Sequence, residues 1–197
     1  MYCGSNSEPC THRGRGFSLI ELLVALAVVT VLTGIAVPLF QRIAQQYRLR
    51  SAIVDVASLL QRARMQCIQN NITRPIQSAG NTQLYLDLNN DGQYNQGEAM
   101  VLLPQNITTA NAGFPAIPAA TLGFANPQGL PARFSGRGVP CAINGAVCTN
   151  YLGGNPVGFI YYLNQNINGV NRWGAVSISP AGQVKTWLNT SGAWRNI

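Results

Sequence analysis

The side chains best suited to chemistry are the oxygen donors of one short acidic segment. Oxygen-bearing residues stand at positions 1, 3, 5 and 12 of this segment and a glycine at position 6: Asp87, Asn89, Asp91, Glu98 and Gly92. This spacing satisfies the pattern of a calcium loop, in which hard oxygen ligands converge on the ion and glycine takes the sharp turn. The flanking segments read as strands, however, whereas an EF-hand needs helices, and Asn-Asp-Gly is a strong turn signal. A calcium site and a β-turn stabilised by Asx side chains are both open, and no other cofactor is expected.

Basic and aromatic residues near the C-terminus suggest a second chemistry, contact with nucleic acid. Arg172, Lys185 and Arg195 lie close in sequence to tryptophans at positions 173, 187 and 194. Cations follow phosphates and aromatic faces stack on bases, so these three cations are candidate DNA contacts. The alternative is that they are scattered, solvated side chains and that the tryptophans belong to the core or its rim.

An apolar segment that contains one carboxylate precedes these candidate sites. Residues 17–40 are long enough to cross a bilayer, since a spanning helix needs roughly 20 apolar residues. Their only full charge is Glu21. A carboxylate in hydrocarbon costs at least about 2.5 kcal/mol, so it needs a partner unless it is an incidental acid of a plain signal anchor. A cleaved secretory signal fits poorly, because the apolar run is longer than an h-region of about 7–15 residues.

The segment from Gly16 to Val24, GFSLIELLV, resembles the processing site and helix start of type IV pilins and type II secretion pseudopilins. The resemblance implies that prepilin peptidase cleaves between Gly16 and Phe17, on the cytoplasmic side, and methylates the new N-terminus of Phe17. Glu21 then becomes the fifth residue of the mature chain. The partner implied for its carboxylate is the amine of a neighbouring subunit's Phe17.

The same resemblance implies a location and a set of partners. The chain is expected to be a single-pass protein of the bacterial inner membrane, with its C-terminal domain in the periplasm, and then to enter a pilus or pseudopilus. The implied partners are other pilins or pseudopilins in a helical filament, the prepilin peptidase, the inner-membrane assembly machinery and the membrane itself.

A helical period continues beyond the apolar segment. Apolar residues recur at alternating spacings of four and three: Leu49, Ile53, Val56, Leu60, Ala63 and Cys67. This stripe predicts one helix from about Phe17 to about Asn70 whose second half packs on a globular domain. Pro38 removes a backbone hydrogen bond and should kink or locally unwind the helix. It resembles the family's proline, near which pilin helices can melt on polymerisation.

The remaining sequence favours β structure, so the expected fold class is α+β. Strands are predicted at 82–88, 99–103, 157–163, 173–179 and 183–188, and loops with short strands over 104–133. The last two strands flank the hairpin turn Pro180-Ala181-Gly182. The expected organisation is a cleaved leader, a transmembrane assembly helix, its amphipathic continuation and a β-sheet or β-sandwich domain, over residues 1–16, 17–40, 41–74 and 75–197. This organisation resembles the GspH/FimT family of minor pilins and H-type pseudopilins.

The cysteines fit a periplasmic domain. Cys141 and Cys148 are expected to form a disulfide outside the cytoplasm. Cys67 lies on the apolar stripe and is predicted to be a buried free thiol.

A structural role is expected rather than an enzymatic one. The sole histidine, His12, lies in the leader, so the mature chain implied by the resemblance lacks the base of a Ser-His or Cys-His pair. The expected function is that of a minor pilin or pseudopilin assembled into a type IV pilus. The alternatives are an H-type pseudopilin of a type II secretion system and a DNA-binding minor pilin for DNA uptake. The Gly-Arg-x-Arg motif associated with DNA-binding members reads GQVK at 182–185, which keeps one cation.

Overall fold

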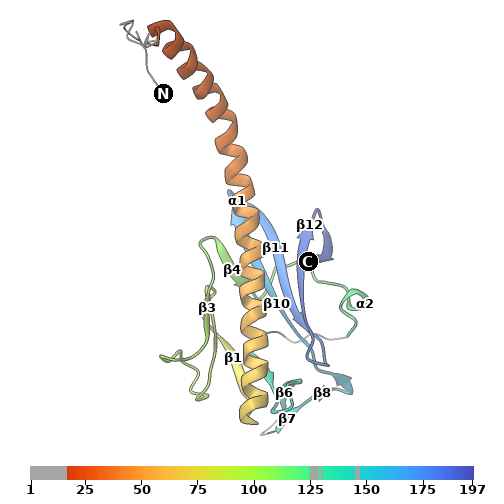
Figure 1. The fold of residues 1–197 in the computed structure, drawn as a ribbon. Helices are drawn as coiled ribbons and strands as arrows, with labels where there is room; N and C mark the ends of the chain where they lie inside the picture. Colours follow the sequence, from red (N-terminus) through yellow and green to blue (C-terminus); the bar gives the residue numbers. More distant parts are fainter. Residues whose placement is uncertain (1–16, 125–128, 130, 145–146) are drawn as a thin grey trace, which may run out of the picture. The chain divides into compact units, whose positions relative to one another are not determined.

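The computed structural model describes residues 17–124, 129, 131–144 and 147–197 (Figure 1). The chain divides into two compact units, which meet between Ala44 and Gln45. One helix, α1 (Leu19–Asn70), contributes to both units. All the described strands follow this helix in the sequence and pair into antiparallel sheets. The fold class is therefore α+β, as predicted.

In the first unit, α1 presents apolar side chains to its surroundings all round. The side chains that the structure describes between Phe17 and Val37 are exposed. The hydroxyls of Thr30 and Thr33 donate to the carbonyl oxygens of Leu26 and Val29, at 2.8 and 2.7 Å, so both are satisfied within the helix. By length and composition α1 can cross a membrane. The helix is continuous through position 38. Of the two effects expected of Pro38, a kink or local unwinding, the unwinding is therefore not seen in this state.

In the second unit, α1 buries the stripe that the sequence predicts. The six predicted positions are all buried, together with neighbouring small and apolar residues: Leu49, Ala52, Ile53, Val56, Leu59, Leu60, Ala63 and Cys67. Burial raises the pKa of the Cys67 thiol, which is the one free cysteine among the residues described. The prediction of a buried free thiol is therefore confirmed.

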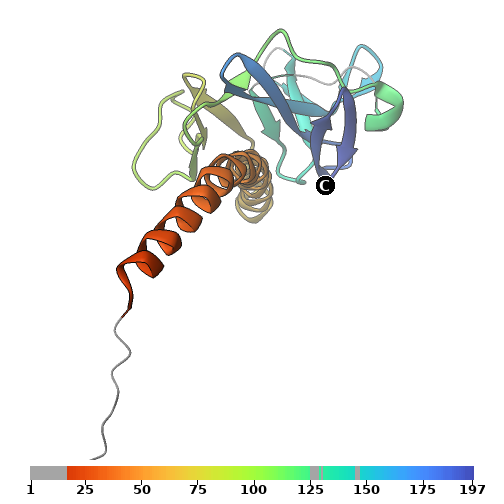
Figure 2. The same ribbon diagram turned by 90° about the horizontal axis from the view of Figure 1, so that it is seen from above.

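A six-stranded antiparallel sheet adjoins this helix, in the order β3-β2-β1-β5-β6-β7 (Figures 1 and 2). Its strands are β1 (Arg74–Ala79), β2 (Gln83–Leu86), β3 (Met100–Leu102), β5 (Ala132–Phe134), β6 (Pro140–Asn144) and β7 (Val147–Thr149). The Cys141–Cys148 disulfide joins β6 to β7, as predicted.

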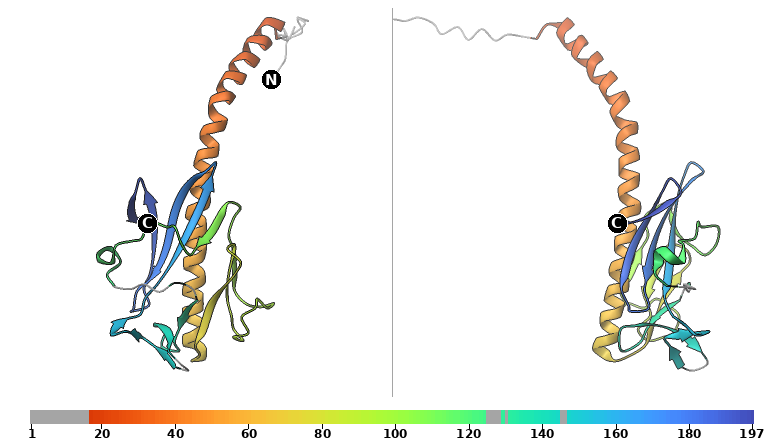
Figure 3. Two further views of the ribbon diagram at one scale, coloured as in Figure 1. Left: turned by 180° about the vertical axis from the view of Figure 1, so that it is seen from behind. Right: turned by 90° about the vertical axis from the view of Figure 1, so that its right-hand side faces the viewer.

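A five-stranded antiparallel sheet lies along the same stretch of α1, in the order β13-β12-β11-β10-β4 (Figure 3). Its strands are β4 (Ile107–Ala110), β10 (Phe159–Ile167), β11 (Val170–Ile178), β12 (Val184–Thr190) and β13 (Ala193–Asn196). A two-stranded hairpin, β8 (Tyr151–Leu152) and β9 (Asn155–Pro156), and a short helix, α2 (Ala119–Leu122), complete the described elements.

One core joins the helix to both sheets. Ile53 of α1, Ile76 of β1 and Val176 of β11 belong to the same buried cluster. At Gly174 of β11 an added Cβ would lie 2.5 Å from Ile53 Cδ1, so glycine lets this strand approach the helix closely. A second cluster, which includes Trp187, covers the face of the five-stranded sheet that points away from α1.

The structure contains the five predicted strands and further strands that were not predicted. The predicted strands at 82–88, 99–103, 157–163, 173–179 and 183–188 correspond to β2, β3, β10, β11 and β12. The last pair flanks the predicted turn, in which the Gly182 N–H donates to the Ser179 carbonyl at 2.7 Å. Strands β1, β6, β7, β8, β9 and β13 were not predicted. Segment 104–133 contains β4, α2 and the start of β5, in line with loops and short strands.

Candidate assembly and binding sites

The predicted processing site lies at the start of the described chain. Gly16 is outside the described residues, and Phe17 is 80% exposed just before α1 begins. Glu21 stands in the first turn of α1, where the positive end of the helix dipole favours a carboxylate. The next basic residue along the helix is Arg42, which at about 1.5 Å per residue lies about 30 Å away. Glu21 therefore has no cation on this helix within reach of an ion pair.

The acidic loop between β2 and β3 is held together by its own carboxylates. Asp87 is fully buried and accepts the backbone N–H groups of Asn90, Asp91 and Gly92. A carboxylate that accepts several amides fixes a tight turn, since each amide would otherwise lose its acceptor.

The other two acids close the same loop. Both oxygens of Glu98 accept backbone N–H groups, from Leu88 at 2.7 Å and from Asn95 at 2.9 Å. Asp91 accepts the N–H of Gln93 at 2.8 Å, and this hydrogen bond is the main reason why the pKa of Asp91 is lowered. All three carboxylates thus serve the backbone or side-chain amides of the loop.

Asp87, Asn89, Asp91 and Glu98 are the residues that would hold calcium. Among the described residues no group of three or more acidic, His or Cys side chains is placed to hold a metal ion. The flanking elements are strands β2 and β3 rather than the two helices of an EF-hand. The geometry accounts for these residues as a turn, and calcium binding stays a prediction.

The three candidate DNA contacts do not share one face of the five-stranded sheet. Cross-strand partners point to the same face. Lys185 pairs with Ser177, which accepts a hydrogen bond from the Trp187 indole on the face away from α1. Arg195 pairs with Leu188, which packs against the core on the helix side. Lys185 and Arg195 therefore point to opposite faces.

Arg172 also points to the helix side of this sheet. It stands two residues before Gly174, which faces Ile53, and directly opposite Gln165 of β10. Within the described structure its Nη1 is buried without a hydrogen-bond partner, as is the Oε1 of Gln165. Arg172 is thus partly enclosed by protein rather than fully presented to solvent.

The turn that carries the GQVK segment is anchored to the helix. Arg64 donates from Nε to the Gly138 carbonyl and from Nη1 to the Gly182 carbonyl, both at 2.9 Å. An added Cβ at Gly182 would lie 2.6 Å from the Gly138 oxygen, so only glycine fits between these groups. The sequence pattern placed Arg64 off the buried stripe and gave no signal of this role.

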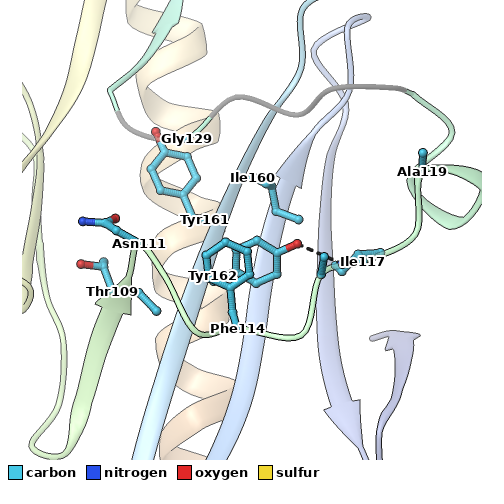
Figure 4. A pocket seen from close by; sticks show the side chains of 11 residues that line it. Thr109, Asn111, Phe114, Ile117, Ala119, Gly129, Ile160, Tyr161 and Tyr162 are labelled. Carbon is cyan, nitrogen blue, oxygen red and sulfur yellow. Dashed lines mark hydrogen bonds between the residues drawn. The ribbon is translucent and has the colours of Figure 1, made fainter.

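A cavity of about 570 Å³ lies where the segment after β4 crosses the outer face of the five-stranded sheet (Figure 4). Phe114 stacks on Tyr162 there with ring centroids 3.9 Å apart, and the Ile117 N–H donates to the Tyr162 hydroxyl at 3.0 Å. None of its described lining residues is charged. The sequence reasoning did not identify this cavity.

Comparison with known proteins identifies the N-terminal segment. Residues 11–37 match the family model described as the prokaryotic N-terminal methylation motif. Pilin-like protein PilA1 of Thermus thermophilus is 36% identical over 88 residues, which cover 43% of this chain and 55% of that protein. The chain therefore spans about half the length of the curated relative it matches. No solved structure matches the chain. The chain is type IV pilin-like, and nothing in these matches separates the GspH/FimT subfamily from other pilins.

Proposed function

We propose that this type IV pilin-like chain is a structural subunit of a helical filament. Prepilin peptidase would cleave between Gly16 and Phe17 and methylate Phe17. The methylation motif over residues 11–37 and the exposed apolar surface of α1 support this proposal. In it the chain first spans the inner membrane once, with residues 75–197 in the periplasm, and is then extracted by the assembly machinery.

The observation that carries the proposal is the position of Glu21. The carboxylate lies on an exposed apolar helix surface, and the next cation along that helix is about 30 Å away. In a membrane or a filament core such a group needs an opposite charge, because an unpaired carboxylate in hydrocarbon is strongly unfavourable. The processed amine of a neighbouring Phe17 would supply that charge. Pairing would then fix the register between subunits.

Among filament subunits, we favour a minor pilin of a type IV pilus. An H-type pseudopilin of a type II secretion system is the alternative, since both classes share the same helix and processing site. A catalytic role is not proposed, because the described acidic side chains serve the turn between β2 and β3 or lie singly on α1.

Substitution of Glu21 tests the proposal. Glu21→Val should be inserted in the membrane normally but should be lost from sheared filaments, because the neighbour's amine has no partner. Glu21→Asp keeps the charge and is the matched control, which should retain part of the incorporation. Incorporation of Glu21→Val at the wild-type level would refute the pairing.

A further inference from the structure

In the part of the chain that the structure describes, β3 and β7 are the outer strands of the six-stranded sheet. At β3, the flanking residues Ala99 and Leu103 bond to the neighbouring strand: the Leu86 N–H donates to the Ala99 carbonyl at 2.9 Å, and the Leu103 N–H donates to the Thr82 carbonyl at 2.8 Å. Backbone groups alternate in direction along a strand, so those of Met100 and Leu102 point away from the sheet. The edge thus offers free donors and acceptors.

Neither edge carries the features that natural proteins use to block pairing, such as charges or prolines within the strand. Strand β3 reads Met-Val-Leu and β7 reads Val-Cys-Thr. Leu102 is 60% exposed and Val147 is 67% exposed. The Cys141–Cys148 disulfide holds β7 against β6, so this edge is fixed before any partner arrives.

Strand direction makes the two edges complementary. Every pairing in this six-stranded sheet is antiparallel, from β3 through to β7. With an even number of strands, β3 and β7 run in opposite directions. If a second copy extends the sheet beyond β3, its strand β7 lies next to β3 of the first copy and runs antiparallel to it. The antiparallel order of the strands then continues from one copy to the next.

The surface beside β3 has room for the side chains of an added strand. A hollow of about 280 Å³ lies between α1 and this edge. Leu59 and Val101 supply apolar surface to it, and Asp55 and Arg62 supply one charge of each sign. The residues of β7 are uncharged and compact, so they would enter such a hollow without burying a charge.

We propose that β3 of one copy pairs with β7 of a second copy, which joins their six-stranded sheets head to tail. Such a heterologous contact produces an open chain unless its rotation closes a ring. Each strand has three residues, so the contact is small and acts together with other subunit contacts. It rests on the proposed filament and requires that copies of this chain adjoin one another there, clustered together if the chain is a minor pilin. It can fail while Glu21-dependent assembly remains.

Site-specific photo-cross-linking of the full-length chain in cells tests this contact. p-Benzoylphenylalanine at position 102 should give a ladder of cross-linked copies, and mass spectrometry should map the second site to residues 147–149. The probe at Val170, which is 62% exposed but paired within a hairpin, is the matched control and should give at least about tenfold less product. A second probe at Met100 covers the case in which position 102 does not tolerate the change.

Charge substitutions provide an independent test of the same contact. Leu102→Asp, with the probe at Met100, should abolish the ladder, and adding Val147→Lys should restore at least half of it. Formation of the Cys141–Cys148 disulfide in each variant reports that the sheet has folded. Cross-links to residues 100–102 of the second copy, cross-links only to other polypeptides, or no ladder from either probe would each overturn the proposal.

Discussion

Arg64 holds Gly182 across 118 positions of sequence: its Nη1 donates to the Gly182 carbonyl oxygen at 2.9 Å, while Nε holds Gly138. One side chain of α1 thus binds the β11–β12 turn and the β5–β6 turn together. Hydrogen bonds from a charged donor contribute about 1.5–3 kcal/mol each when they are shielded from water.

Arg64→Met should therefore destabilise the domain. The substitution keeps the apolar stem but removes both hydrogen bonds, so the free energy of unfolding should fall by about 2–4 kcal/mol. Arg62→Met, at an exposed position two residues away, should change it by less than about 0.5 kcal/mol. Denaturant unfolding of the full chain in detergent, followed by tryptophan fluorescence, measures both. Equal stability of the two variants would contradict the anchoring role.

Close packing of Gly174 against Ile53 gives a paired prediction. Gly174→Ala places a Cβ about 2.5 Å from Ile53 Cδ1 and should cost about 1–3 kcal/mol of unfolding free energy. Ile53→Val removes that methyl group, so the double variant should be more stable than the sum of the two single effects predicts. A double-mutant cycle by thermal unfolding measures the coupling. Strict additivity would show that the two residues do not press on each other.

The hydrogen bonds of the acidic loop predict that the stability of the domain depends on the Asp87 carboxylate. Asp87→Ala removes the buried carboxylate that accepts three backbone N–H groups of the loop, and it should lower the unfolding free energy by about 2–4 kcal/mol in the presence of a chelator. If the carboxylates serve only the turn, excess calcium should leave the melting temperature of the wild-type chain unchanged. A calcium-dependent rise that is lost in Asp91→Ala would instead establish the calcium site.

Because Lys185 and Arg195 lie on opposite faces of the sheet, their substitution should have unequal effects on DNA affinity. If the chain takes up DNA, it should retard DNA at low salt and release it as salt rises. Lys185 and Arg195 point to opposite faces, so a single DNA segment bound to one face should lose affinity on substitution of only one of them to Ala. Electrophoretic mobility shift of the full-length chain and of each variant measures this. Absence of retardation at low salt would remove the DNA-uptake role.

The sequence predicts those parts of the fold that a local pattern governs. The buried stripe of α1 follows from the helical period through Leu49 and Cys67, and the β11–β12 hairpin follows from the turn at Gly182. Strand β1 was not predicted because it begins Arg-Pro and is half polar, and β13 was not predicted because it has only four residues, two of them polar. Both are strands because of their neighbours in the sheet rather than because of their own composition.

The candidate sites depend more strongly on distant contacts. The acceptors of Arg64 lie 74 and 118 residues away, so no local pattern identifies them. The faces of Lys185 and Arg195 depend on strand register, which shifts a side chain to the opposite face with each residue. The methylation motif is different in kind, because it is a local sequence signal and could be recognised without the fold.

The most direct measurement is mass spectrometry of filaments sheared from the cell surface, with the N-terminus of this chain identified. The account predicts a chain that begins with methylated Phe17 and is present in the filament fraction. A chain that keeps residues 1–16 and remains in the cell envelope would contradict processing and assembly together. A processed chain that never enters sheared filaments would contradict the pilus and favour the secretion pseudopilus.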